Sequence, residues 1–179
     1  MAFSAGTIAF FAGLFLLAAQ GEPPGDVPEN LRAPADEQLV LHAHAKGFQM
    51  YVCQAATDDK FSWALKAPDA KLFDAHGKTI GQHYAGPAWK HNDGSEVTGK
   101  VVARHDAPEA GSIPWLLLAA AGHSGSGLLS EVTSIQRLHT QGGQAPAAGC
   151  EESKKGTETK MPYSADYYFY AAAKAQGRN

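Results

Sequence analysis

Short hydrophobic runs separated by turn-forming residues occupy most of the chain from residue 38 to residue 171. In the run 38–45 (QLVLHAHA), leucine and alanine positions would share one face of a strand, and His42 and His44 would share the other. The run 113–121 (IPWLLLAAA) is apolar throughout and fits either a buried strand or a short buried helix, because periodicity does not separate the two. The remaining runs lie at 48–54, 61–65, 97–103, 132–138 and 167–171.

Turn signals interrupt these runs at short intervals, for example at Gly86-Pro87 and at 92–94 (NDG). Many short strands with frequent turns are typical of a sandwich or a barrel. We therefore predict an all-β fold, a single-domain antiparallel sandwich or barrel over residues 38–171. Trp63 and Trp115 each have apolar neighbours in their runs, and we expect both to be core residues.

The two ends of the chain differ from this β domain. Residues 6–19 are apolar and uncharged, which is too short for a comfortable membrane span but typical of a signal-peptide core. We predict a signal peptide at 1–20, with an uncleaved anchor as the alternative, because residues 1–5 contain no Lys or Arg. Residues 21–37 are expected to be a proline-rich acidic linker, and residues 172–179 a flexible tail. The protein would then be secreted or periplasmic, with no stable membrane span after signal cleavage.

Two cysteines, Cys53 and Cys150, lie far apart in the sequence and outside any metal-ligand spacing. In an exported protein such a pair usually forms a disulfide, so we predict one here; two unrelated buried thiols are the alternative. The net charge of −3 and the dispersed charged residues argue against nucleic acid as a partner.

The segment 81–95 (GQHYAGPAWKHNDGS) holds the densest group of candidate binding residues. His83 can act as a base or a ligand near neutral pH, and Tyr84 and Trp89 can stack on a sugar or another flat molecule. On a strand, His83 and Tyr84 would face opposite ways, so we expect His83 and Trp89 to line one surface cleft. Arg137 can bind a carboxylate in bidentate fashion; the alternative is a structural ion pair with Asp166 or Glu131.

The eight histidines suggest a second kind of site. His42 and His44, spaced i and i+2, would point to the same side of a strand, and His83 could supply a third ligand for a divalent metal. The alternative is that these histidines are polar residues on a solvated face. No other cofactor is indicated.

Several motifs together resemble the family known as domain of unknown function 3455, which comprises exported proteins of bacteria and fungi. The resemblance covers nearly all of residues 38–170 and implies a shared fold and an exported location, but no activity or site residue. It rests on GxQxYxC (47–53), APDAxLFD (67–74), GxHYAGPxW (81–89), DGS (93–95), IPWLLL (113–118), IQRLxTxGGxAP (135–146), GC (149–150) and YSADYYFY (163–170).

We therefore expect an exported β-domain protein that serves as a ligand-binding or structural module of the cell envelope or extracellular space. Its partner would be a glycan, a cell-surface polymer or a small ligand. The alternative is a metal-binding protein or metal-dependent enzyme built on His42, His44 and His83.

Overall fold

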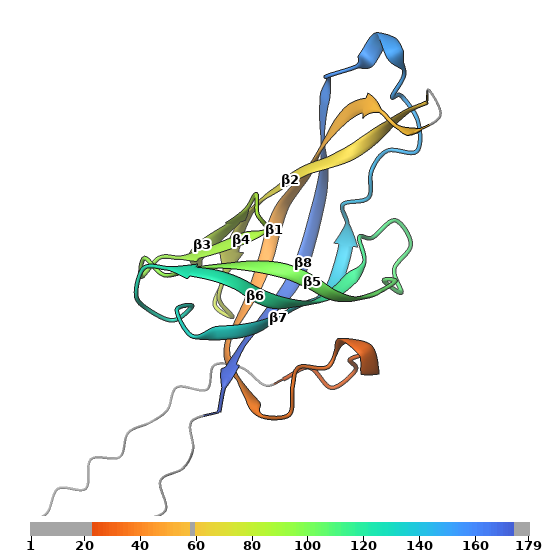
Figure 1. Ribbon diagram of the computed structural model, residues 1–179. Helices are drawn as coiled ribbons and strands as arrows, with labels where there is room; N and C mark the ends of the chain where they lie inside the picture. The colour runs from red at the N-terminus through yellow and green to blue at the C-terminus, as the bar shows by residue number, and fades with distance from the viewer. Residues whose placement is uncertain (1–22, 58–59, 174–179) are drawn as a thin grey trace, which may run out of the picture.

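A computed structural model describes residues 23–57 and 60–173. Eight antiparallel strands follow one another around a closed barrel, and β8 pairs with β1 to complete the ring (Figure 1). The all-β prediction is confirmed, and of the two architectures left open the fold is the barrel. The strands are β1 (Glu37–Ala55), β2 (Phe61–Phe73), β3 (Thr79–Tyr84), β4 (Ala88–His91), β5 (Glu96–His105), β6 (Trp115–Ser124), β7 (Val132–Gly142) and β8 (Glu158–Ala172).

The strands differ from the predicted runs: β3 and β4 correspond to no predicted run, and β2 and β8 are longer than the runs 61–65 and 167–171. The runs 38–45 and 48–54 form one strand, β1, which continues through Gly47. At that point β2 crosses so closely that a Cβ on Gly47 would lie 2.2 Å from the carbonyl oxygen of Asp69. The ambiguous run 113–121 contributes to a strand, β6, and not to a helix.

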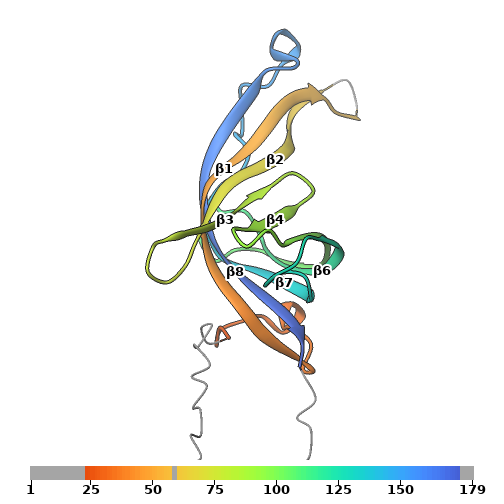
Figure 2. The same ribbon diagram turned by 90° about the vertical axis from the view of Figure 1, so that its left-hand side faces the viewer.

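Strands β1, β2 and β8 extend well beyond the other strands at one end of the barrel (Figure 2). The loop before β8 is tied to this extension by the Cys53–Cys150 disulfide, as predicted. The Trp63 indole on β2 donates a hydrogen bond to the carbonyl oxygen of Ala148 in the same loop, at 3.0 Å. Trp63 remains only half-buried, so its predicted place in the core is wrong; its indole supports the loop from the surface.

The barrel interior holds the main apolar core. Tyr167 and Phe169 of β8 point inward together, as alternation along a strand requires, and pack with Trp89 of β4. Burial of each such large apolar side chain contributes roughly 1.5–3 kcal/mol. The other large, fully buried members of this core are Leu72, Val97, Leu118, Leu129 and Ile135.

A second apolar cluster lies on the outside of the barrel, under the proline-rich segment before β1. Leu31, in the 3-10 helix η1 (Glu29–Leu31), is completely buried there against Trp115, Leu138, Tyr168 and Tyr170. The Gln136 side chain donates a hydrogen bond to the carbonyl oxygen of Leu31 at 2.7 Å. The segment expected as a linker therefore packs against the barrel wall from Val27 to Ala33. Trp115 is buried as predicted, although in this outer cluster.

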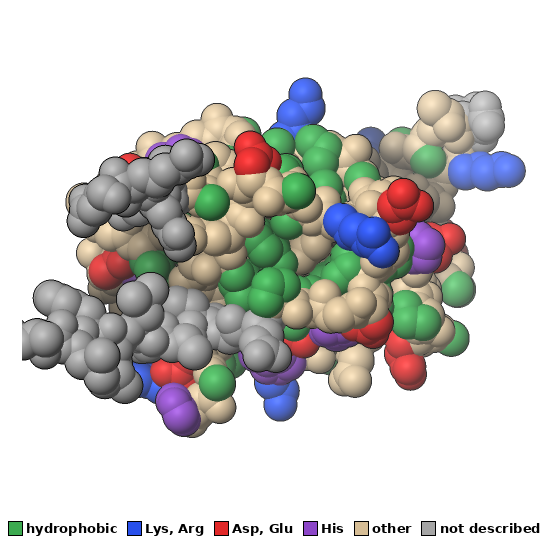
Figure 3. Space-filling view, turned by 90° about the horizontal axis from the view of Figure 1, so that it is seen from below, with side chains coloured by type: hydrophobic (Ala, Val, Ile, Leu, Met, Phe, Trp, Pro, Cys, Tyr) green, Lys and Arg blue, Asp and Glu red, His purple; other side chains and the backbone are tan. Residues whose placement is uncertain are grey.

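On the face drawn in Figure 3, hydrophobic side chains gather in the middle and charged side chains lie mostly toward the edge. No helix within residues 23–57 and 60–173 is long and apolar enough to cross a membrane. The predicted signal peptide and most of the predicted tail, residues 174–179, lie outside the described residues. β8 ends at Ala172, and the next residue, Ala173, still donates its backbone N–H to Asp36.

Candidate functional site

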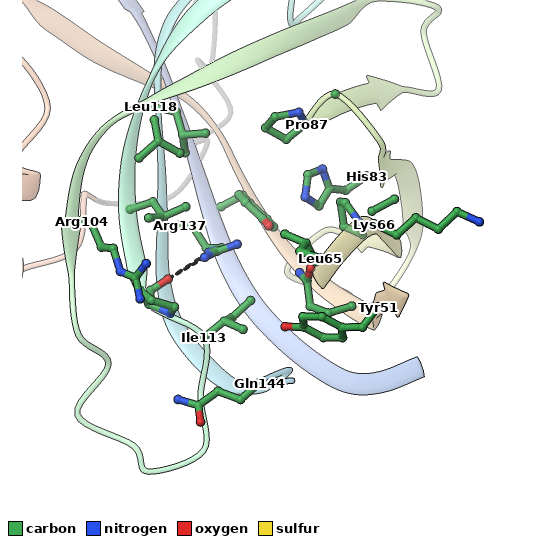
Figure 4. A pocket seen from close by; sticks show the side chains of 18 of the residues that line it. Tyr51, Leu65, Lys66, His83, Pro87, Arg104, Ile113, Leu118, Arg137 and Gln144 are labelled. Carbon is green, nitrogen blue, oxygen red and sulfur yellow. Dashed lines mark hydrogen bonds between the residues drawn. The ribbon is translucent and has the colours of Figure 1, made fainter. Parts of the chain in front are cut away.

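A cavity of about 760 Å³ opens into the barrel (Figure 4). All eight strands contribute side chains to its lining, from Tyr51 on β1 to Tyr167 on β8. An eight-stranded barrel is either filled by its own side chains or wide enough to hold one small ligand. The volume falls within the range of small-molecule sites in proteins, which is roughly 300–1,000 Å³.

His83 and Trp89 form one wall of this cavity. A tight turn over residues 85–87 joins β3 to β4 and sets the two residues directly opposite each other in the strand register. Their rings are stacked, with centroids 4.5 Å apart and planes 7° from parallel, and Tyr167 meets both rings edge-on. The predicted association of His83 with Trp89 is therefore present, but inside the barrel, where His83 is only 2% exposed.

His83 is held as a neutral imidazole. Burial lowers its pKa to about 3; the hydrogen bond to Ala88 opposes this shift, and the positive charge of Arg137 adds to it. Nδ1 lies 2.8 Å from the Ala88 carbonyl oxygen, which can only accept, so Nδ1 carries the proton. Nε2 is then the lone-pair nitrogen, which in this neutral ring serves as a hydrogen-bond acceptor.

Arg137 reaches into the cavity from β7. Its Nε and Nη2 both donate to the Pro114 carbonyl oxygen, at 3.1 and 2.8 Å (Figure 4). Within the described residues, no carboxylate lies within 4.0 Å of its guanidinium. The structural ion pair with Asp166 or Glu131 is thus absent from this part of the chain, and Asp166 faces the outside of the barrel.

Some buried polar atoms of the lining have no hydrogen-bond partner among the described residues. They include Nε2 of Gln49 and Nε1 of Trp89. A buried polar group left unsatisfied costs about 1–3 kcal/mol, so such groups are informative where they cluster. Burial raises the pKa of Tyr167, and the charge of Arg137 and weak hydrogen bonds with Tyr163 and Arg137 act against this shift; the phenol stays protonated.

The charges of the lining are all positive. Lys66, Arg104 and Arg137 line the cavity, and no Asp or Glu of the described chain does so. This contrasts with the net charge of −3 on the whole chain. Lys66 is paired with Glu158 near the opening, which leaves the two arginines as the cations without a carboxylate partner in the described chain.

Tyr84 is not part of the cavity. It follows His83 on β3 and so points to the other side of the strand, where it is half-buried. A hydrogen bond to Glu96 raises the pKa of its hydroxyl, and burial adds to this. Of the four residues predicted to bind ligand, His83, Trp89 and Arg137 thus meet in one cavity, whereas Tyr84 lies elsewhere.

His42 and His44 lie outside the barrel, on the opposite side of the wall from His83. They gather with His139 around Asp166: His42 Nε2 and His44 Nδ1 lie 3.3 and 3.1 Å from Oδ1, and His139 Nδ1 lies 3.0 Å from Oδ2. His83 therefore cannot join His42 and His44 on one ion. Among the described residues, no group of three or more His, Cys, Asp or Glu side chains is arranged to hold a metal ion.

Three features of the cavity were missed by the sequence reasoning. Gln49 and Tyr51 alternate on β1, so a Gln–x–Tyr pair within an apolar run was the available signal for two inward polar groups. Arg104, near the end of β5, carried no local signal. Tyr167 lies in the predicted run 167–171, where nothing in the sequence separates it from its aromatic neighbours.

The comparisons with known proteins add one family and no relatives. The family described as "Protein of unknown function (DUF3455)" matches residues 34–171, which is most of the chain. No curated protein and no solved structure matches.

Proposed function

The chain belongs to the family described as "Protein of unknown function (DUF3455)", and from this premise we propose that it is a binding protein for a small, largely apolar molecule held inside the barrel. The observation that carries the proposal is the cavity of about 760 Å³, bounded by side chains from all eight strands. Because strands surround this space, it favours a small molecule over a glycan chain or a cell-surface polymer, which would need a groove along the surface.

The opening of the cavity supports an apolar ligand. Leu65 of β2 and Val101 of β5 line the cavity, yet they are 59% and 46% exposed. Large exposed apolar side chains that adjoin a cavity are typical of ligand-binding sites. Inside, Ile113, Leu116 and Leu118 continue the apolar wall.

We place this binding outside the cytoplasm. The Cys53–Cys150 disulfide is the support, because disulfides persist in oxidising compartments and are rare in the cytosol. A carrier or scavenger in the envelope or extracellular space would need only to bind and release its ligand.

The test is titration with a neutral fluorescent apolar probe, N-phenyl-1-naphthylamine. Ala67 lines the cavity, so Ala67→Trp should fill part of it and weaken probe binding at least tenfold. Ala64→Trp is the matched control, because Ala64 lies on the same strand and does not line the cavity. Circular dichroism should show the same fold for both variants. Equal binding by both variants, or no binding by the parent, would overturn the proposal.

A further inference from the structure

We infer that the ligand is an amphipathic carboxylate whose anionic head binds Arg137 inside the barrel. This inference rests on the proposed function and adds the chemical class of the ligand. An arginine has five N–H donors, and the contacts with Pro114 use one on Nε and one on Nη2. Three donors remain. The Tyr167 hydroxyl lies close enough to accept from one of them, and no carboxylate of the described chain reaches the guanidinium.

A planar carboxylate is the group that matches such a set of free donors. It can accept two parallel N–H bonds from one guanidinium, which gives both strength and orientation. A cation without a counter-charge in a partly desolvated site is costly, so a neutral head group would leave that cost in place. The lining offers no Asp or Glu from the described residues to supply the missing charge.

The neighbouring polar atoms are also suited to an anion. Gln49 Nε2 and Trp89 Nε1 are buried donors with no partner among the described residues, and both residues line the same cavity as Arg137. The Tyr167 hydroxyl, which lies beside Arg137 and Tyr163, keeps its proton free to donate. Each can donate to an oxygen, and none of them brings negative charge. Apart from the acceptor nitrogen of His83, the polar groups named here can all donate to an anionic head group.

The remaining, apolar part of the cavity wall indicates the chemistry of the rest of the ligand. Arg137 lies between Leu118 and Ile113 in the close view of the site (Figure 4), and the wall continues through apolar side chains to Leu65 and Val101 at the opening. A head at Arg137 would place an apolar body along this wall. The ligand is thus one anionic group on an aliphatic or aromatic body.

Isothermal titration of the full chain with decanoate and 1-decanol, below their aggregation limits, tests this directly. The two probes differ in the head group alone. We expect decanoate to bind the parent about tenfold to a hundredfold more tightly than 1-decanol, the range expected for a charge-assisted hydrogen-bonded pair. Decyl sulfate, a tetrahedral anion, should bind less tightly than decanoate if the planar head is what the site recognises.

Variants locate the head group. Arg137→Met should remove the preference for decanoate, Arg137→Lys should retain part of it, and Lys100→Met, which removes an exposed charge from β5 outside the cavity, should leave it unchanged. If Arg104→Met removes the preference and Arg137→Met does not, the anion lies at the opening and the assignment to Arg137 is overturned.

The outcome for the parent protein separates the two proposals. Equal affinity for decanoate and 1-decanol, with both displacing N-phenyl-1-naphthylamine, overturns the inference about charge and leaves the binding function standing. Failure of the parent to bind any of the three overturns both. The comparison needs no variant, so it holds even if Arg137→Met does not fold.

Discussion

The imidazole of His83 lies flat against the indole of Trp89, 4.5 Å from centroid to centroid, inside the barrel. The pair forms because β3 and β4 place the two residues opposite each other, and Tyr167 of β8 closes the edge of both rings. A histidine in this position is almost completely shielded from solvent. It contributes a flat, neutral surface with one donor and one acceptor, and not a charge.

The burial of His83 predicts a specific dependence of stability on pH. Its pKa is lowered by burial to about 3 in the folded protein, against an ordinary value near 6.5. Between these two values of pH, His83 is protonated in the unfolded chain but stays neutral in the folded protein. The free energy of unfolding should fall as pH drops from about 6.5 toward 3, by about 1 kcal/mol per pH unit from this group.

Urea denaturation between pH 4 and 7 measures this dependence. His83→Asn can keep a donor toward Ala88 but cannot titrate, so its unfolding free energy should vary less with pH than that of the parent. His105→Asn, which removes an exposed histidine on β5, should keep the parental dependence. A His83→Asn protein with the parental dependence would show that folding does not lower the pKa of His83.

The disulfide predicts a large loss of stability on reduction. Cys53 and Cys150 are 97 positions apart and join the end of β1 to the loop before β8. In the chain-entropy model, opening a loop of this size costs up to roughly 4–5 kcal/mol. Guanidinium denaturation with and without reductant should show a lower midpoint for the reduced protein.

The double variant Cys53→Ser, Cys150→Ser supplies the matched control for that experiment. It should unfold at the midpoint of the reduced parent and should not respond to reductant. A parent whose midpoint is the same in both conditions would contradict the prediction.

How far the sequence could predict this fold depends on which interactions are local. Alternation of apolar and polar residues identifies the first part of β1, because successive side chains of a strand point to opposite faces. Barrel closure depends on the pairing of β1 with β8, which are far apart in the chain, so the sequence left sandwich and barrel open. Leu31 is buried because it meets Tyr168 and Tyr170 outside the barrel, a contact that no local pattern reveals.

The candidate site divides in the same way. The nearness of His83 to Trp89 was predictable, since a short hairpin joins them, whereas the meeting of both with Arg137 depends on the closed ring. His42 and His44 share a side of β1 as alternation requires. Their third histidine is His139, which a register shift in β7 brings to the same outer face. Which face of β3 points inward, and with it the position of His83, depends on how the eight strands close into a barrel.

Two tryptophans of contrasting burial test the description of the core. Trp89 is 1% exposed and packs on Tyr167 and Phe169, whereas Trp63 is half-buried at the end of β2. Trp89→Ala should lower the free energy of unfolding by about 3–5 kcal/mol. Trp63→Ala should cost less, because less apolar surface is lost with it. Denaturant titration compares the two, and equal losses would contradict this assignment of the core.

The last prediction concerns Asp166 on the outside of the barrel. Its carboxyl is partly buried, and burial alone would raise its pKa, but hydrogen bonds from His42, His44 and His139 outweigh this and lower the pKa to about 2. His139 adopts a positive φ of 49°, which is strained for a residue other than glycine and is maintained here by contacts with Asp166 and Trp115. The Asp166 carboxylate therefore holds the three histidines together on this outer face of the barrel.

The sign of the pH effect follows from that lowered pKa. The folded protein holds Asp166 ionised more strongly than the unfolded chain does, so its contribution to stability is present above pH 4 and is lost as pH falls toward 2. Asp166→Asn should lower the free energy of unfolding at pH 7 by about 1.5–3 kcal/mol, the range for hydrogen bonds to a charged group. The variant should also lose less stability than the parent between pH 4 and 2. Asp106→Asn, at an exposed position after β5, is the control, and an Asp166→Asn protein that matches it in both respects would show that the three histidines do not depend on the carboxylate.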